Sequence, residues 1–156
     1  MIKLLRVDKR LLHGQVAFTW TSSLGADCIL IACDTLQNDP LRLTTIKLSK
    51  PSGAKLVIKN VKESIAAINE GKTDKYVLFI VVECIKDAYR LLKGCPDIGG
   101  VSLGYTDARE GCEKLANSIF ATEEEVGLLR ELIQDGKDVT IQTVPTAKAT
   151  SVKKML

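Results

Sequence analysis

The sequence predicts an α/β fold: a three-layer, open, mostly parallel sheet of about seven strands with helices on both faces. The main observation is that short apolar runs alternate with helix-like segments along the whole chain. Several of these runs, notably Cys28–Cys33 and Val77–Val82, are apolar at every position, which is typical of parallel strands covered by helices on both sides. The length of 156 residues fits one domain, and we expect residues 1–156 to form it.

Each strand is predicted from a run of this kind. The seven runs are Ile2–Val7, Cys28–Cys33, Lys55–Lys59, Tyr76–Val82, Gly100–Leu103, Ser118–Ala121 and Val139–Thr143.

The helices are predicted from their termini and their periodicity. Asp39-Pro40 is typical of an N-cap followed by proline in the first turn, and predicts a helix to about Lys50. Thr122-Glu-Glu-Glu125 is a capping box, and Gly136 is expected to end the helix that it begins. Further helices are expected over Gln15–Leu24, Val61–Glu70, Lys86–Leu92 and Arg109–Ala116.

Composition excludes several classes of protein. A net charge of +3 and an aromatic content of 4% give little support to nucleic-acid binding. The five cysteines include no CxxC pair and there is one histidine, so we expect reduced thiols and no metal site. The N-terminus lacks the long apolar region of a signal peptide and no apolar run reaches the length of a membrane span, which predicts a cytoplasmic protein.

The loop after the first strand, Asp8-Lys-Arg-Leu-Leu-His-Gly-Gln15, is the part of the chain richest in polar chemistry. Ligands of open α/β sheets bind at the carboxyl ends of strands, where this loop lies. It holds the only histidine, His13, with Arg10 close by and Asp8 able to fix the tautomer of the ring. Gly14 allows close backbone approach at the start of a helix, whose free N–H groups attract anions.

These groups suit a neutral imidazole that attacks phosphorus and holds a phosphoryl group transiently. An ordinary histidine pKa of ~6.5 leaves the attacking nitrogen unprotonated near neutral pH. Backbone N–H groups and Arg10 would stabilise the charge on the phosphoryl oxygens. No Walker or GxGxxG motif occurs, so no nucleotide, metal or other cofactor is expected. The alternative, that His13 is a surface or core residue without chemistry, has about equal support from the residues alone.

The stretch Arg6-Val-Asp-Lys-Arg-Leu-Leu-His-Gly-Gln-Val16, followed by Trp20, closely resembles the signature of enzyme IIB components of the mannose/fructose/sorbose family of the bacterial sugar phosphotransferase system. Cys33–Asp39, Lys50–Gly53 and Leu129–Pro145 resemble further parts of the family pattern, so the resemblance covers nearly the whole chain.

The resemblance implies a phosphocarrier that accepts a phosphoryl group from enzyme IIA on His13, through Nδ1, and passes it to a sugar translocated by membrane components IIC and IID. It implies that Arg10 holds the phosphoryl group and that Asp8 shapes the loop or orients the ring. A second set of residues is expected to bind the phosphoryl group or the partners: Arg6, Gly14, Gln15, Asp34, Ser102 and Gly104.

Two departures from the family pattern stand out. Lys9 replaces a common acidic residue, and Ser102 lies in a segment where many members carry N-x-G-G. They leave open a second hypothesis, a non-catalytic or regulatory module that binds a small anion or a partner protein on the same fold. The sequence names neither the sugar (mannose, fructose, sorbose, galactosamine or N-acetylgalactosamine) nor the oligomeric state, and a homo-oligomer is compatible with it. Asp34 and Asp39 could line the mouth of the site, but Asp39 is at least as well explained as an N-cap. We expect Trp20 to lie in the core or to face a partner rather than to be catalytic, and Lys153-Lys154 to form a solvated tail.

Overall fold

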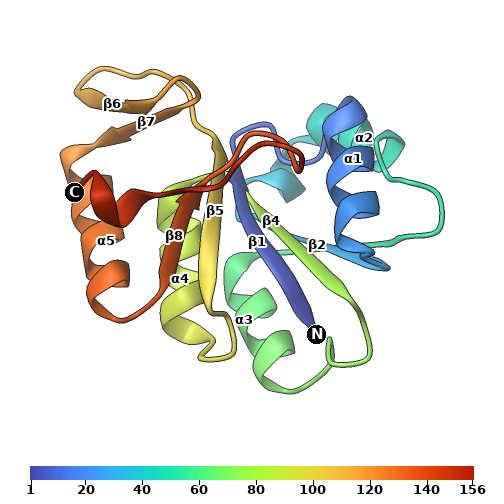
Figure 1. The fold of residues 1–156 in the computed structure, drawn as a ribbon. Coiled ribbons are helices and arrows are strands. Elements are labelled where there is room, and N and C mark those ends of the chain that lie inside the picture. Colours follow the sequence, from blue (N-terminus) through green and yellow to red (C-terminus); the bar gives the residue numbers. More distant parts are fainter.

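A computed structural model describes all of residues 1–156 and confirms the three-layer α/β architecture, with a seven-stranded sheet in the middle (Figure 1). The strands of this sheet are β1 (Ile2–Asp8), β2 (Cys28–Ala32), β3 (Lys55–Lys59), β4 (Leu78–Val82), β5 (Gly100–Tyr105), β8 (Asp138–Ile141) and β9 (Thr150–Ser151). Their spatial order is β3-β2-β4-β1-β5-β8-β9. Neighbouring strands pair in parallel except β8 and β9, which are antiparallel.

Five α-helices and one 3-10 helix lie between the strands, and a second 3-10 helix follows the last strand. They are α1 (Gly14–Leu24), η1 (Leu36–Asn38), α2 (Pro40–Leu48), α3 (Val61–Asn69), α4 (Ile85–Gly94), α5 (Glu123–Gln134) and η2 (Val152–Lys154). No helix of the chain has the length and apolar character needed to cross a bilayer.

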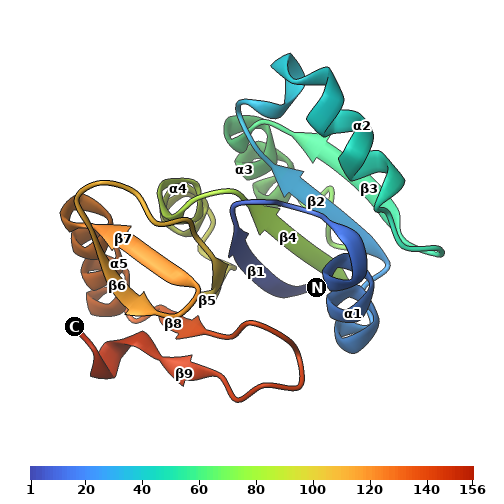
Figure 2. The same cartoon turned by 90° about the horizontal axis from the view of Figure 1, so that it is seen from above.

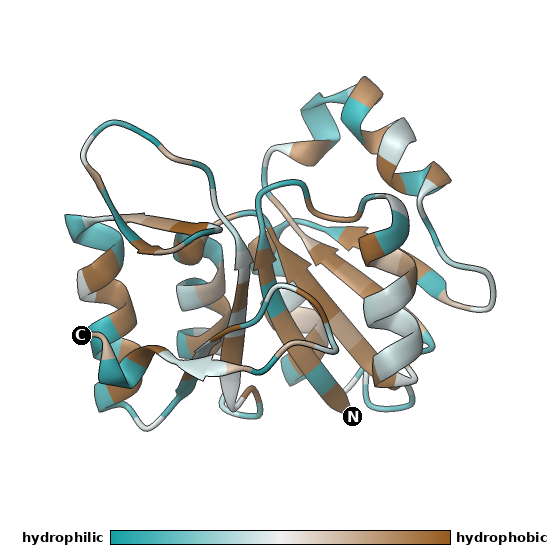
Figure 3. Cartoon of the chain, turned by 45° about the horizontal axis from the view of Figure 1, so that its top comes forward, coloured by the Kyte–Doolittle hydropathy of each residue, from teal (hydrophilic) through white to brown (hydrophobic).

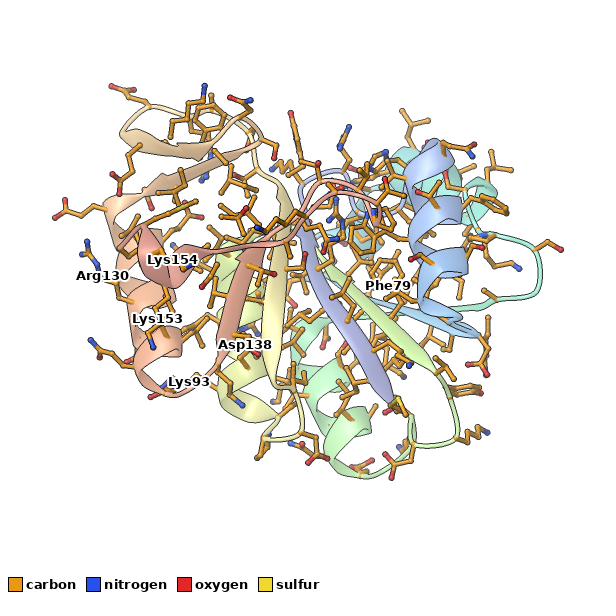
Figure 4. All side chains as sticks on the ribbon, viewed as in Figure 1. Phe79, Lys93, Arg130, Asp138, Lys153 and Lys154 are labelled. Carbon is orange, nitrogen blue, oxygen red and sulfur yellow. The ribbon has the colours of Figure 1, made fainter.

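The helices lie on both faces of the sheet, and each face has its own core. Trp20 of α1 and Ile46 of α2 share a 12-residue buried cluster with strand residues such as Phe79, which Figure 4 labels between the sheet and α1. Helices α3, α4 and α5 cover the other face through a buried cluster of 26 residues. The two cores are separate because successive strand side chains point to opposite faces of the sheet.

The helix termini predicted from local sequence are confirmed. The Asp39 carboxylate accepts a hydrogen bond from the Arg42 backbone N–H at 3.2 Å, and Pro40 opens α2. Thr122 and Glu125 form the complete capping box of α5. Gly136 has φ +84° just beyond the last turn, a conformation that favours glycine and ends the helix.

The helix predicted over Arg109–Ala116 is wrong. That segment instead forms β6 (Cys112–Ala116), which pairs antiparallel with β7 (Ile119–Thr122) in a separate two-stranded sheet. The Thr106 hydroxyl accepts from the Phe120 N–H at 2.7 Å and fixes the hairpin to the end of β5. The segment forms a strand because it pairs with β7, and this contact cannot be read from the periodicity of the segment itself.

The strand predicted at Ser118–Ala121 therefore belongs to the hairpin and not to the main sheet. The seventh strand of the main sheet is β9, in a segment with no strand prediction. The C-terminal lysines are exposed as expected, but they are not on a loose tail, because Val152 beside them is fully buried. Between β8 and β9 the chain reaches across β5 and β1 towards α1 (Figures 1 and 2).

Candidate active site

The loop between β1 and α1 has two sides. Leu11 and Leu12 are 3% and 2% exposed and pack into the core beneath α1, whereas Lys9 and Arg10 between them and the strand are exposed. Leu11 has φ +59°, a left-handed conformation that costs a non-glycine residue energy, and its N–H donates to the Asp8 carbonyl at 2.8 Å. Burial of the two leucines holds this loop in one shape, which makes it a fixed support for His13.

Asp8 is the centre of the loop. Its carboxylate is 1% exposed, and Oδ1 accepts from the Arg10 backbone N–H at 2.9 Å and from Arg10 Nε at 3.3 Å. Its Oδ2 lies 3.2 Å from His13 Nε2 and 3.8 Å from Arg6 Nη2. The structure thus brings the three predicted catalytic residues, Asp8, Arg10 and His13, into contact.

The contact between Asp8 and His13 has a chemical consequence. A carboxylate only accepts hydrogen bonds, so the hydrogen of a neutral imidazole resides on Nε2 and the lone pair is at Nδ1. Nδ1 makes no hydrogen bond with the protein, and the His13 side chain is 22% exposed. The Asp8 contact therefore leaves Nδ1 as the ring nitrogen without a partner in the protein.

His13 also occupies the N-cap position of α1, with extended backbone angles and no side-chain capping bond. Gly14 follows with φ +43°, and both Gly14 and Gln15 are exposed. The backbone N–H groups of the first helical turn have no acceptors within the helix, and the helix dipole makes this end positive. An anion beside His13 would meet these groups.

Arg10 supplies the fixed positive charge next to the ring. Its guanidinium stacks on the Tyr105 ring at 4.2 Å, its Nε is bound by Asp8, and both terminal nitrogens make no hydrogen bond with the protein. The side chain is 49% exposed. Sequence reasoning missed Tyr105, although an aromatic residue at the carboxyl end of a strand is a signal that could have found it.

Arg6, by contrast, faces the interior and is 2% exposed. Its Nη1 donates to the Gln142 carbonyl at 2.7 Å, its Nη2 donates to the Thr143 carbonyl at 3.0 Å, and its guanidinium lies 4.6 Å from the Trp20 ring. Burial lowers the pKa of Arg6 to about 10, against the opposing effect of the Asp8 charge. Arg6 ties the loop between β8 and β9 to the strand that carries Asp8. Its Nε has no hydrogen-bond partner, but the guanidinium is buried and not open to solvent.

Ser102 and Gly104 lie on β5 beside Arg6. Ser102 pairs with Arg6 in the strand register and is 2% exposed, and its hydroxyl has no hydrogen-bond partner. A Cβ atom at Gly104 would overlap with the Arg6 guanidinium. These two positions shape the space around Arg6 and do not face solvent next to His13.

Asp34 points away from the loop that holds His13. Its carboxylate accepts from the N–H of Val61, the first residue of α3, at 2.9 Å and from Nη1 of Arg90 in α4 at 2.7 Å. These hydrogen bonds lower the pKa of Asp34, and the bond from Val61 has the larger effect. Asp34 therefore connects two helices, and Asp39 is the N-cap of α2 as expected.

A further arginine, Arg42 of α2, contacts the loop and was not predicted. Its Nη2 donates to the Lys9 carbonyl at 3.0 Å, and its Nη1 pairs with Glu83 at 2.8 Å. Burial opposes ionisation of Glu83, but the hydrogen bond and charge of Arg42 outweigh it and lower the Glu83 pKa. No sequence signal links Arg42 to Lys9, because they lie 33 residues apart.

The His13 ring is partly open to solvent, with 22% of its side chain exposed. No residue of 6–16 lines the hollow between α2 and β3 or the one beside Phe18 and Val144. Small-molecule sites are usually concave and bury most of their ligand. An accessible ring on a fixed loop is better suited to a reactive group that another protein presents.

Comparison with known proteins shows the family to which the chain belongs. The family model described as the sorbose subfamily IIB component of the PTS, the phosphotransferase system, matches residues 2–156. A probable phosphotransferase enzyme IIB component of Streptococcus pyogenes serotype M6 is 33% identical, over 94% of this chain and 93% of its own length. The chain is therefore a phosphotransferase component of a sugar-transport system, and it belongs to the sorbose-type IIB family.

Solved structures and other relatives extend the comparison. The IIBSor domain of the sorbose permease from Klebsiella pneumoniae has the same fold, with a TM-score of 0.92 at 23% identity over 99% of this chain and 94% of that one. The mannose-specific EIIAB component of Escherichia coli is 27% identical over 94% of this chain, which matches 45% of that longer protein. Other relatives are named for sorbose and N-acetylgalactosamine, so the names do not agree on one sugar.

Proposed function

We propose that this chain is a phosphocarrier that accepts a phosphoryl group on His13 Nδ1 from the phosphohistidine of an enzyme IIA and transfers it to a sugar. The observation that carries the proposal is the 3.2 Å contact between His13 Nε2 and Asp8 Oδ2, which leaves Nδ1 as the free nitrogen. Residues 1–156 would act as one EIIB domain, without a metal, nucleotide or other cofactor.

The transfer exchanges one P–N bond for another. The Nδ1 lone pair of neutral His13 attacks phosphorus, the P–N bond of the donor breaks, and a protonated donor ring leaves as neutral imidazole. The phosphorylated His13 ring keeps the hydrogen on Nε2 and becomes positive, and the buried Asp8 carboxylate stabilises that charge. In the second step a sugar hydroxyl oxygen attacks phosphorus, the P–N bond to Nδ1 breaks, the ring returns to its neutral form with the hydrogen still on Nε2, and the hydroxyl proton is released to solvent.

The residues around the ring have separate roles in this proposal. The free terminal nitrogens of Arg10 and the N–H groups at Gly14 and Gln15 bind the phosphoryl oxygens. Tyr105 holds Arg10 in place by stacking. Arg6, Ser102, Gly104 and Asp34 act as positioning residues, since their side chains contact the protein interior or neighbouring helices.

Membership of the family supports a proposal for the partners. We propose that a IIA protein is the donor and that membrane components IIC and IID present the sugar, which places the chain in the cytoplasm at the inner face of the membrane. The EIIAB name of the mannose-specific relative, in which the matching part is 45% of the length, supports a IIA partner.

The test is intact-protein mass spectrometry after incubation with phosphoenolpyruvate, enzyme I, HPr and a IIA protein. We expect one acid-labile phosphoryl group on the parent chain and none on His13→Ala. Arg10→Gln should take up the group about 100-fold more slowly while its thermal unfolding changes little, because Arg10 is half-exposed.

Two outcomes would contradict the proposal. An adduct that persists in His13→Ala would place the acceptor elsewhere. No adduct on the parent chain, with each of several IIA proteins shown to be phosphorylated, would favour the non-catalytic binding module.

A further inference from the structure

Helix α2 has apolar side chains on two opposite sides. Ile46 is 1% exposed and Leu43 packs beside it in the core beneath the helix. Leu41 and Leu48 are 79% and 82% exposed, the highest values among the large apolar side chains of the molecule. They are seven positions apart, which places both on the same side of the helix, two turns from each other. Figure 3 shows hydrophobic and hydrophilic positions alternating along this helix.

The segment that contains α2 and β3 is positively charged, whereas the rest of the chain has a negative net charge. Between Asp39 and Glu63 there is no acidic residue, and every charge is positive. The six basic residues of this segment are Arg42, Lys47, Lys50, Lys55, Lys59 and Lys62. Because the whole chain has a net charge of +3, the remaining residues together carry −3. The only ion pair among the six is that of Arg42 with Glu83, so the five lysines have no acidic partner.

The folded chain places Lys47, Lys50 and Lys55 of this segment along one edge. Strand β3 ends the main sheet on this side, and Figure 2 shows α2 and β3 together at the outer edge of the molecule. A hollow of about 500 Å³ between the end of α2 and β3 is lined by Leu56 and Ile58 together with Lys47, Lys50 and Lys55. We call Leu41, Leu48 and the three lysines Lys47, Lys50 and Lys55 the α2–β3 edge.

We propose that the α2–β3 edge docks on the surface of an anionic lipid bilayer, with Leu41 and Leu48 entering the headgroup region. Exposed leucines flanked by lysines are the combination that interfacial helices use, and each lysine near an anionic leaflet adds to the attraction. Lysine is depleted at protein–protein interfaces, and Leu41 and Leu48 protrude from the helix, as shallow insertion requires. A lipid surface therefore fits the edge better than an acidic protein.

The α2–β3 edge is close to the loop that holds His13, so docking through it would affect where that loop lies. Arg42, in the first turn of α2, donates to the Lys9 carbonyl, so α2 is tied to the loop that holds His13. A chain that rests on the bilayer through α2 would keep this loop close to the membrane surface. The inference goes beyond the proposed function, because lipid binding does not require His13 to carry a phosphoryl group.

The test is co-sedimentation with vesicles of 30% phosphatidylglycerol in phosphatidylcholine, at low and at physiological salt. We expect binding to these vesicles, little binding to pure phosphatidylcholine, and weaker binding as salt rises. Lys47→Gln with Lys55→Gln should weaken binding about fivefold per lysine. Leu41→Ser with Leu48→Ser should weaken it by about tenfold or more.

The matched control is Lys153→Gln with Lys154→Gln, which removes two exposed lysines at the opposite side of the molecule (Figure 4). This control and His13→Ala should bind as the parent chain does, which separates lipid docking from phosphoryl transfer. Circular dichroism melting verifies that each variant is folded.

Several outcomes would overturn the proposal. These are no binding to anionic vesicles, equal binding to phosphatidylcholine, an equal loss in the Lys153/Lys154 control, or full binding by the leucine variant. Self-association of the parent chain that only the leucine variant abolishes, without lipid binding, would show that a second copy covers the edge.

Discussion

The end of β1 and the α2–β3 edge hold their charges in opposite ways. Arg6 and Asp8 are 2% and 1% exposed, and each has several polar contacts. Along the α2–β3 edge, Lys47 and Lys55 are exposed and have no acidic partner. A buried charge that loses its partner destabilises the fold, whereas an exposed charge contributes little to it. The first region is therefore built to position His13, and the second leaves its charges available to something outside the chain.

The largest effect on stability is expected from Asp8→Asn, which removes the negative charge from the buried group of charges at the end of β1. Arg6 would keep its charge in the interior without a counter-charge, and the free energy of unfolding should fall by about 3 kcal/mol in urea titrations. Glu124→Gln removes an exposed carboxylate paired with Lys86 at 3.5 Å and should change stability by less than about 0.5 kcal/mol. A loss below about 1 kcal/mol for Asp8→Asn would mean that backbone carbonyls alone stabilise Arg6.

Gly104→Ala tests the same region through packing. The added methyl group would overlap with the Arg6 guanidinium, so we expect a loss of about 2 kcal/mol in the free energy of unfolding. The fluorescence of Trp20, the only tryptophan, should also shift, because Arg6 lies 4.6 Å from its ring. Gly99→Ala, in open space just before β5, is the control and should change neither quantity. Unchanged stability in Gly104→Ala would show that Arg6 is free to move.

A smaller effect is expected at low pH from Asp34. Hydrogen bonds from Val61 and Arg90 hold its pKa below the ordinary value of 3.8. The folded chain therefore binds this proton less readily than the unfolded chain. The resulting stability is present above the ordinary value and is lost as the pH falls through the lower folded value.

Asp34→Asn should thus reduce the free energy of unfolding at pH 6, and the free energy should fall less steeply between pH 5 and pH 2 than in the parent chain. Urea titrations at pH values from 6 to 2 measure both effects. The half-exposed carboxylate limits their size, because solvent screens the pair with Arg90. If stability fell between pH 5 and pH 2 as steeply as in the parent chain, the decline would be due to other carboxylates.

The smallest effect on stability is expected at the α2–β3 edge. Lys47→Gln with Leu48→Ser should leave the free energy of unfolding within about 0.5 kcal/mol of the parent chain, because both side chains are exposed. Thermal and urea unfolding measure this. A loss above about 1 kcal/mol would mean that these side chains stabilise the fold, and would remove the contrast between the two regions.

Local signals account for the parts of the fold that the sequence predicted well. The N-cap at Asp39 and the capping box at Thr122 depend on residues within one helical turn, and both are present in the structure. The apolar runs Cys28–Cys33 and Val77–Val82 contain strands β2 and β4, which are buried on both faces. A short run that is apolar at every position is typical of such strands, so the sequence predicted them correctly. Strand β6 was wrongly predicted as a helix because its pairing with β7 is not visible in the local periodicity, whereas the β7 segment was predicted as a strand.

The site divides in the same way. Asp8, Arg10 and His13 lie within six positions, so the sequence could place them in one loop. Tyr105, Gln142 and Arg42 come from distant segments, and no spacing in the sequence connects them to that loop.

The sequence by itself determined the α/β class, the loop rich in polar groups after the first strand, and the all-positive segment between Asp39 and Glu63. These depend on periodicity, turn chemistry and charge, which are local properties. Only the tertiary structure decided that Arg6 faces inward and Arg10 outward, that Asp8 contacts Nε2 of His13, and that Leu41 and Leu48 remain uncovered. Those facts depend on which strands pair and which helix covers which face, because burial and hydrogen bonding are set by neighbours far away in the chain.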